Sequence, residues 1–230
     1  MHNKKDIILL HGALGTSQQF TPLISHLEGE YNIHTFDLPA HGELAYQADE
    51  LSMFSFANYV RNYIIKNNLQ KPLVFGFSMG GFVALTLQSQ TNIFSKIMTL
   101  NTKLEWDLET AEREQKMFDP EIILEKVPHY ADLLIAMHGE ENWKSLLAKH
   151  RNMMFTIAKS TPLTDYALSK INIPVLLTKG DRDNMVTSEE TRVVVGKLSD
   201  AEFYEFENTA HPIEKIDLNL LSSKIKEFLI

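Results

Sequence analysis

The sequence contains no cysteine among its 230 residues. This absence excludes a disulfide framework, a thiolate metal site and a cysteine nucleophile. Long apolar runs are missing as well: the longest one near the N-terminus covers residues 7–10, which is too short for the core of a secretion signal. No stretch approaches the roughly 18 apolar residues of a membrane-spanning helix. We therefore expect a cytoplasmic protein without a membrane partner.

Basic residues are scarce relative to acidic ones, with 22 Lys and Arg against 30 Asp and Glu and a net charge of −8. Without a basic block, the chain is a poor candidate for binding nucleic acid. The hydrophobic share of 44% and the charged share of 23% are those of an ordinary globular protein. The length favours one domain with at most an inserted subdomain. We expect a small-molecule partner, and the oligomeric state stays open.

Short apolar runs alternate with longer amphipathic segments, which predicts an α/β fold with a mostly parallel sheet flanked by helices. Buried parallel strands are expected to be continuous apolar runs. The expected strands cover residues 6–10, 33–36, 72–77, 96–100, 174–178 and 202–206. The expected helices of this core cover residues 17–27, 53–66, 79–89, 188–198 and 212–229.

The segment between the fourth and fifth strands breaks the alternation. Its pattern predicts helices at 120–126, 130–137 and 142–159 and no strand. Because so long a connection is uncommon as a plain loop, we expect a helical cap at 103–171, inserted into a core made of residues 1–102 and 172–230. Its methionines (Met117, Met137, Met153 and Met154) fit packing inside the cap, or alternatively an adaptable pocket lining.

A G-x-S-x-G motif formed by Gly76, Ser78 and Gly80 lies between an expected strand and an expected helix. A serine nucleophile needs this strand–turn–helix setting, because the tight turn projects its hydroxyl beyond the strand end. The two glycines lack a Cβ that would clash in such a turn. A helix N-terminus also favours negative charge near Ser78. The motif therefore predicts that Ser78 is a nucleophile, although a glycine-rich turn with a bystander serine would read the same way.

A serine nucleophile needs a base, and the base needs an acid that orients it. His211 follows the last expected strand, while Asp181 and Asp183 follow the strand before it. Loops after parallel strands share one edge of the sheet, so these side chains can converge on Ser78. We favour His211 as the base and Asp183 as the acid, and Asp181 remains the alternative.

An oxyanion hole needs two backbone N–H groups aimed at the developing charge. One should come from Met79, directly after the nucleophile, and the other from Ala13 in the loop after the first strand. Gly12 would let that loop approach the substrate, and His11 should hold the loop rather than act as a base. The other histidines show no metal-binding spacing, so we expect neither a metal nor another cofactor.

Taken together, these motifs resemble the α/β-hydrolase superfamily, in particular its small capped esterase, lactonase and thioesterase-like branch. The matching segments are 8–12, 36–42, 76–81, 180–183 and His211. The resemblance implies a Ser78–Asp183–His211 triad, with an oxyanion hole formed by Ala13 and Met79. One departure is the turn at 40–42, which reads Ala-His-Gly where the family usually has Gly-His-Gly. Another is that the family's first two strands are missing, so we expect about six strands, all parallel.

The leading hypothesis for function is a serine hydrolase acting on a small carboxylic ester, lactone or thioester through an acyl-enzyme at Ser78. The same triad could instead support C–C bond hydrolysis, elimination of the kind found in menaquinone biosynthesis, or perhydrolysis. Substrates rich in carboxylates would require an arginine or lysine beneath the cap. A third hypothesis is a non-enzymatic ligand-binding protein built on a hydrolase frame.

Overall fold

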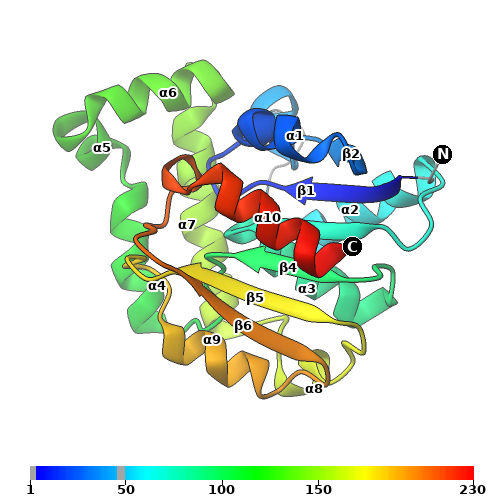
Figure 1. The fold of residues 1–230 in the computed structure, drawn as a ribbon. Coiled ribbons are helices and arrows are strands. Elements are labelled where there is room, and N and C mark those ends of the chain that lie inside the picture. The colour runs from blue at the N-terminus through cyan, green and yellow to red at the C-terminus, as the bar shows by residue number, and fades with distance from the viewer. Residues whose placement is uncertain (1–3, 46–49) are drawn as a thin grey trace.

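The computed structural model describes residues 4–45 and 50–230. Within them lies a six-stranded sheet with the order β2-β1-β3-β4-β5-β6, and neighbouring strands pair in parallel (Figure 1). The strands are β1 (Lys5–Leu10), β2 (Tyr31–Thr35), β3 (Leu73–Phe77), β4 (Ile97–Leu100), β5 (Val175–Gly180) and β6 (Ala201–Phe206). The expected all-parallel sheet of about six strands is confirmed.

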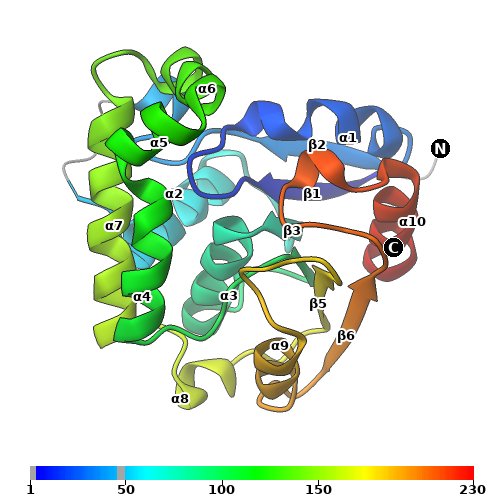
Figure 2. The ribbon, with the colours of Figure 1, turned by 90° about the vertical axis from the view of Figure 1, so that its left-hand side faces the viewer.

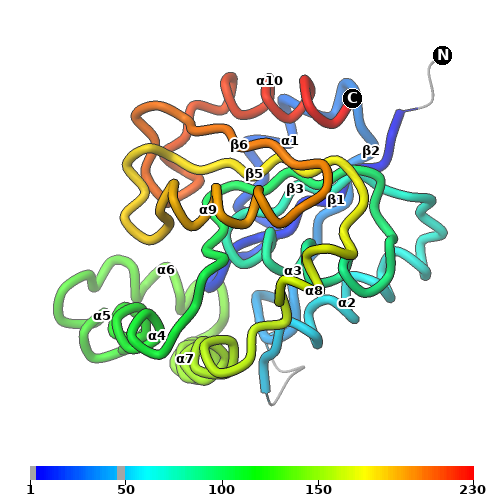
Figure 3. Tube along the Cα trace, turned by 90° about the horizontal axis from the view of Figure 1, so that it is seen from below, coloured from blue at the N-terminus to red at the C-terminus, as the bar shows by residue number. Residues whose placement is uncertain are grey.

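Both faces of the sheet are covered by helices, as Figure 3 shows. Side chains alternate between the two faces along a strand. Ile7 and Leu9 of β1 pack in one apolar cluster with α1 and α10, whereas Ile8 and Leu10 pack in the other cluster with α2 and α3. The covering helices are α1 (Thr21–Leu27), α2 (Met53–Lys66), α3 (Met79–Thr91), α9 (Ser188–Val195) and α10 (Leu218–Leu229). The continuous apolar runs of the inner strands β3, β4 and β5 follow from burial on both faces.

Two expected helices are divided in the structure. The segment expected at 17–27 forms the short helix η1 (Ser17–Phe20) and then α1. The segment expected at 212–229 forms η4 (Ile213–Lys215), and α10 begins only at Leu218. The break has a local cause: the Asp217 carboxylate accepts the backbone N–H groups of Asn219 and Leu220, and so caps a new helix start.

The chain between β4 and β5, which we call the insertion (residues 101–174), is helical. Its elements are α4 (Leu108–Glu114), η3 (Gln115–Phe118), α5 (Pro120–Lys126), α6 (Pro128–His138), α7 (Trp143–Lys159) and α8 (Asp165–Leu168). Figure 2 shows α4 to α7 gathered beside the carboxyl ends of the strands. The apolar face of α7 is buried in the same cluster as α2 and α3, so the insertion packs directly on the core.

The methionines of the insertion differ in how deeply they are buried. Met153 and Met154 are buried in α7, and Met137 packs against the same apolar cluster. Met117 is the exception, with 49% of its surface exposed. Packing within the insertion therefore accounts for three of the four. In the described part of the chain, no helix combines the length and the apolar character that crossing a membrane requires.

The strand register brings the loops of interest to one edge of the sheet. Phe77 at the end of β3 pairs with Leu100 at the end of β4, and Leu100 pairs with Thr178 in β5. Gly180 at the end of β5 in turn pairs with Phe206 at the end of β6. The segments that follow these strands therefore leave the sheet side by side, facing the insertion.

Candidate active site

Ser78 lies in the turn between β3 and α3, with φ of 50° and ψ of −115°. A positive φ is uncommon for a residue other than glycine, and holding one costs about 1–3 kcal/mol. Neighbouring strands stabilise the turn: the Ser78 N–H donates to the Leu100 carbonyl at 2.8 Å, and the Thr102 hydroxyl donates to the Ser78 carbonyl at 3.0 Å. Hydrogen bonds from the edge of the sheet therefore stabilise this strained conformation of Ser78.

Glycine is required on both sides of this turn because the backbone passes so closely. A Cβ on Gly80 would lie 2.1 Å from the carbonyl oxygen of Leu10 in β1. A Cβ on Gly76 would lie 2.5 Å from the Cα of Gly81. Neither obstacle is a flexible side chain, so no larger residue fits without moving the backbone. This is the close approach that the G-x-S-x-G spacing indicates.

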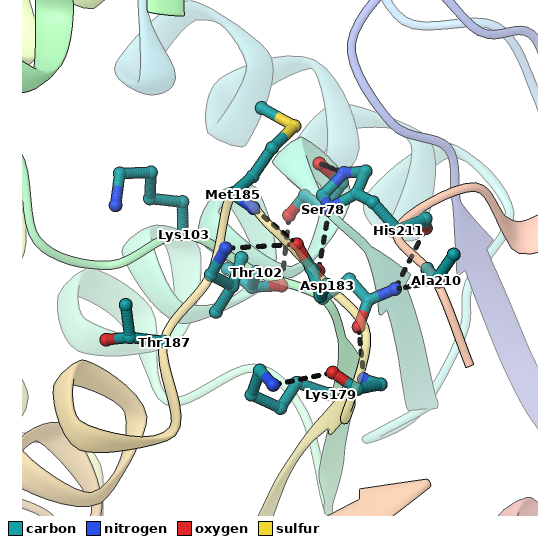
Figure 4. Close-up of polar contacts among 12 residues, drawn as sticks. Ser78, Thr102, Lys103, Lys179, Asp183, Met185, Thr187, Ala210 and His211 are labelled. Atoms are coloured by element: carbon teal, nitrogen blue, oxygen red, sulfur yellow. Dashed lines mark hydrogen bonds and ion pairs between the residues drawn. The ribbon is translucent and has the colours of Figure 1, made fainter. Parts of the chain in front are cut away.

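The side chains of Ser78, His211 and Asp183 form a hydrogen-bonded chain (Figure 4). His211 Nε2 lies 3.2 Å from Ser78 Oγ, and His211 Nδ1 lies 2.7 Å from Asp183 Oδ2. The Asp183 side chain is fully buried, whereas 19% of the His211 side chain is exposed. With Nδ1 protonated and donating to Asp183, the Nε2 lone pair faces the serine hydroxyl.

The Asp183 carboxylate is fixed by its other oxygen as well. Asp183 Oδ1 accepts the backbone N–H groups of Met185 at 2.7 Å and Val186 at 3.0 Å. Three donors therefore satisfy this buried carboxylate, which offsets the cost of removing it from water. Its orientation toward His211 is set by the backbone of the loop after β5.

Asp181 has a different environment from Asp183. Its carboxylate accepts the backbone N–H of Thr209 at 3.0 Å, which ties the loop after β5 to the loop after β6. Hydrogen bonds from the backbone of Asn208 and Thr209, together with the nearby Arg182 charge, lower the pKa of Asp181. Of the two aspartates that the sequence offers, Asp183 is the one that contacts His211.

Asn101 joins three of the loops at this edge, and sequence reasoning missed it. Its Oδ1 accepts the Gly180 N–H at 2.7 Å, while its Nδ2 donates to the carbonyls of Ala210 at 3.2 Å and His211 at 2.8 Å. Asn101 has a φ of 54°, a conformation that asparagine tolerates better than most residues. An asparagine directly after a buried strand was the available signal.

The backbone N–H groups of Ala13 and Met79 donate to no protein acceptor within residues 4–45 and 50–230, so both remain able to donate to a substrate. Met79 is the first residue of α3. Ala13 lies in the loop after β1, which passes close to the turn at Ser78: a Cβ on Gly12 would be 3.3 Å from the Ser78 Cβ. The two amides therefore come from segments that flank the serine.

His11 holds the loop that carries Ala13. Its Nδ1 donates to the Gly12 carbonyl at 2.8 Å, and its Nε2 accepts the Leu38 N–H at 2.9 Å. Burial lowers the pKa of His11 to about 4, so the ring is neutral near pH 7. Both ring nitrogens are occupied by backbone groups, and neither contacts Ser78.

No residue of the described chain suggests a metal centre. Within residues 4–45 and 50–230, no group of three or more histidine, aspartate or glutamate side chains could hold a metal ion together. The groups gathered at this edge are a hydroxyl, an imidazole, a carboxylate and the two backbone amides.

Comparisons with known proteins identify the fold family of the chain. The model of one protein family, described as alpha/beta hydrolase fold, matches residues 6–147. The uncharacterized hydrolase YugF of Bacillus subtilis (strain 168) is 22% identical over an alignment 262 positions long, and the alignment covers 98% of this chain and 90% of YugF.

Among solved structures, a thermophilic esterase from Thermogutta terrifontis is similar, with a TM-score of 0.79 at 16% identity and coverage of 99% of this chain and 90% of that one. The enol-lactonase from Burkholderia xenovorans LB400 has a TM-score of 0.76 at 15% identity, with coverage of 99% and 92%. At these identities the likeness to both structures is one of fold alone.

Proposed function

Because the chain belongs to the alpha/beta hydrolase fold family, we propose that it is a serine hydrolase that cleaves a small carboxylic ester, lactone or thioester. The observation that carries the proposal is the hydrogen-bonded chain from Ser78 Oγ through His211 to Asp183, with distances of 3.2 Å and 2.7 Å. In this proposal Ser78 is the nucleophile, His211 the general base and Asp183 the residue that orients the imidazole.

The first half of the proposed reaction forms an acyl-enzyme. Ser78 Oγ attacks the substrate carbonyl carbon while His211 Nε2 takes the hydroxyl proton. The carbonyl oxygen becomes an oxyanion, which the N–H groups of Ala13 and Met79 stabilise by hydrogen bonds. His211 then gives its proton to the departing alcohol or thiol as the bond to the acyl carbon breaks.

Water completes the cycle in the second half. His211 removes a proton from a water molecule, which attacks the acyl carbon and releases the free acid from Ser78. The exposed part of the His211 side chain is the side from which water can reach the ring. One water is consumed for each ester bond cleaved, and the residues return to their starting protonation.

We infer further that the insertion acts as a cap, with residues 103–171 covering a core made of residues 1–102 and 172–230. This inference is supported by the position of α4 to α7 beside the carboxyl ends of the strands (Figure 2). The size of the acyl or leaving group that reaches Ser78 would then depend on the helices of the insertion.

Arginines of the insertion bear on the alternative reactions that use carboxylate-rich substrates. Arg113 lines a cleft of about 570 Å³ between the start of the insertion and α9, but its Nε donates to the Glu114 carboxylate at 2.9 Å. Arg151 likewise donates to Gln115 at 3.0 Å. Neither contact places an arginine beside Ser78, and the residues that line this cleft do not include Ser78 or His211, so we favour ester, lactone or thioester hydrolysis over C–C cleavage or elimination.

The proposal is tested with a panel of nitrophenyl esters of increasing acyl length, using the wild type and Ser78→Ala. We expect wild-type turnover and its loss to the uncatalysed rate in Ser78→Ala. The matched control is Ser25→Ala, which removes an exposed serine on α1 and should keep full activity. Turnover that survives Ser78→Ala would refute the assignment.

A fluorophosphonate separates the enzyme from a ligand-binding protein on the same frame. This reagent phosphonylates an activated serine, so the folded wild type should be labelled and Ser78→Ala should not. Labelling of Ser78 without turnover of any ester in the panel would point to another reaction of the same nucleophile. Folded wild-type protein that resists labelling would favour the binding protein.

A further inference from the structure

Four histidines that take no chemical part in the proposed mechanism are buried where the insertion meets the core. They are His11 in the loop after β1, His41 after β2, His138 in α6 and His150 in α7, each no more than 2% exposed. The ring centroid of His41 lies 5.0 Å from the ring centroids of His11 and His150. It lies 5.9 Å from that of His138. We call these four residues the histidine cluster.

His138 is the member of the cluster that reaches the loop carrying Ala13 from the insertion. Its Nε2 lies 3.0 Å from the Leu14 carbonyl oxygen, and its Nδ1 lies 3.0 Å from the Gly42 backbone nitrogen. The Gly42 N–H can only donate a hydrogen bond, and the Leu14 carbonyl can only accept one. These partners therefore require a neutral ring with its proton on Nε2.

Leu14 has a conformation that needs support. The Gly15 N–H donates to the Gly12 carbonyl at 3.2 Å and closes a four-residue turn with Ala13 and Leu14 at its centre. Leu14 has a φ of 58°, a sign that favours glycine or asparagine at this position of a turn. A leucine pays a steric penalty there, so an external bond to its carbonyl helps to hold the turn.

Three side-chain hydrogen bonds hold this turn. Gln19 accepts the Gly12 N–H at 3.3 Å, His11 donates to the Gly12 carbonyl at 2.8 Å, and His138 donates to the Leu14 carbonyl at 3.0 Å. The first two come from the core, whereas His138 comes from α6 of the insertion. The hydrogen bond from His138 therefore couples the position of the insertion to the conformation of the loop beside Ser78.

We propose that His138 is a positioning residue, which orients the Ala13 N–H for the oxyanion by holding the Leu14 carbonyl from the insertion. The inference rests on the proposed function, since it assigns a role to the oxyanion loop of that same site. Both ring nitrogens of His138 bond to backbone groups of Gly42 and Leu14 rather than to Ser78 or His211. The effect of His138 passes through the turn at Gly12 to Gly15.

Two conservative variants separate the two hydrogen bonds of His138. In His138→Gln the amide nitrogen can take the place of Nε2 and still donate to Leu14. In His138→Asn the shorter amide can take the place of Nδ1 and accept from Gly42, but it does not reach Leu14. A purely structural role would affect both variants through their folded fraction, not through the turnover of each folded molecule.

The experiment measures kcat and KM on the best nitrophenyl ester, with active sites counted by fluorophosphonate labelling. We expect kcat per site to fall about tenfold or more in His138→Asn with KM little changed. In His138→Gln it should recover to within a few-fold of the wild type. An alkyl trifluoromethyl ketone, which forms an oxyanion on the serine, should lose affinity for His138→Asn in parallel with kcat. The matched control His150→Gln changes the same cluster without touching the loop and should keep kcat.

Equal turnover in His138→Asn and the wild type, or an equal loss in both variants, would overturn the role of His138 and leave the proposed function standing. If the wild type neither hydrolyses the panel nor reacts with the fluorophosphonate, the proposed function fails and the inference fails with it. If His138→Asn does not fold, folding and kcat are measured instead on the double variant that combines His138→Asn with Leu14→Gly. Glycine adopts the positive φ without help, so the double variant should fold and retain kcat within a few-fold of Leu14→Gly. A double variant that stays unfolded or inactive would overturn the inference.

Discussion

Replacing His150 with glutamine should make the protein more resistant to acid. His150 is fully buried in α7, and its Nε2 lies 2.9 Å from the Nε2 of His41. Within the described residues its Nδ1 has no hydrogen-bond partner. Burial, with smaller contributions from His11 and His138, lowers the pKa of His150 from 6.5 to about 3. The folded protein therefore keeps this ring neutral at pH values where the unfolded chain protonates it.

The pKa difference fixes the sign and size of the effect. Above pH 6.5 both states hold a neutral His150, and the residue adds no pH dependence. Below that value only the unfolded chain binds the proton, so the free energy of unfolding falls by about 1.4 kcal/mol per pH unit until the folded pKa is reached. Between pH 8 and pH 5 the loss attributable to His150 is about 2 kcal/mol.

Glutamine keeps a donor toward His41 but cannot titrate. Urea denaturation at pH 8 and at pH 5, for the wild type and for His150→Gln, gives the drop in unfolding free energy of each protein. That drop should be about 2 kcal/mol smaller in the variant. Any pH-independent cost of the substitution cancels, because each protein is compared with itself.

His129→Gln is the control, because it removes a solvent-exposed histidine from α6 of the same insertion. Its drop between pH 8 and pH 5 should equal that of the wild type. An equal drop in His150→Gln and the wild type would show that His150 is protonated in the folded protein, and the reasoning from burial would be refuted.

Three further substitutions probe the site and its support. Asp183→Asn should lower kcat by about 10³–10⁴ with KM little changed, because the amide no longer fixes the His211 tautomer; steady-state kinetics checks this. Gly80→Ala should destabilise the fold by about 3 kcal/mol or more in urea denaturation, because its Cβ would meet a backbone carbonyl at 2.1 Å. Glu190→Gln should cost about 3 kcal/mol in the same assay, because it leaves the Lys103 ammonium, whose side chain is only 9% exposed, without a counter-charge.

Each of these variants has a matched control in the same chain. Asp181→Asn should stay within a few-fold of wild-type kcat, and a collapse as large as that of Asp183→Asn would reverse the assignment of the acid. Gly29→Ala adds a Cβ that meets no atom within 4 Å, so a loss equal to that of Gly80→Ala would contradict the steric argument. Asp165→Asn breaks an exposed ion pair with Lys197 and should cost under about 1 kcal/mol.

The four inner strands of the sheet could be predicted because each carries its own signal. A strand that is buried on both faces must be apolar at every position, and this property is local in the sequence. Helix boundaries were less certain, since α10 begins at Leu218 rather than at Pro212. There the apolar spacing of Ile213 and Ile216 continued past the true boundary, while the cap at Asp217 decided it.

The proximity of Ser78, Asp183 and His211 could be anticipated from topology alone, because parallel strands deliver their loops to one edge. The histidine cluster could not. His41 and His150 are 109 positions apart, and their contact depends on how the insertion seats on the core. No periodicity or spacing records such a contact, so these histidines looked like ordinary residues of helices and turns.

The candidate site therefore has two kinds of support. Ser78, Asp183 and His211 are held by the ends of the strands and by Asn101, all at the edge of the sheet. The turn that carries Ala13 is held partly by the core and partly by His138 of the insertion. In the proposed mechanism, a change in the insertion would then alter oxyanion stabilisation while leaving the hydrogen bonds between the serine, the histidine and the aspartate intact. Substrate selection and transition-state stabilisation would be coupled through the same helices.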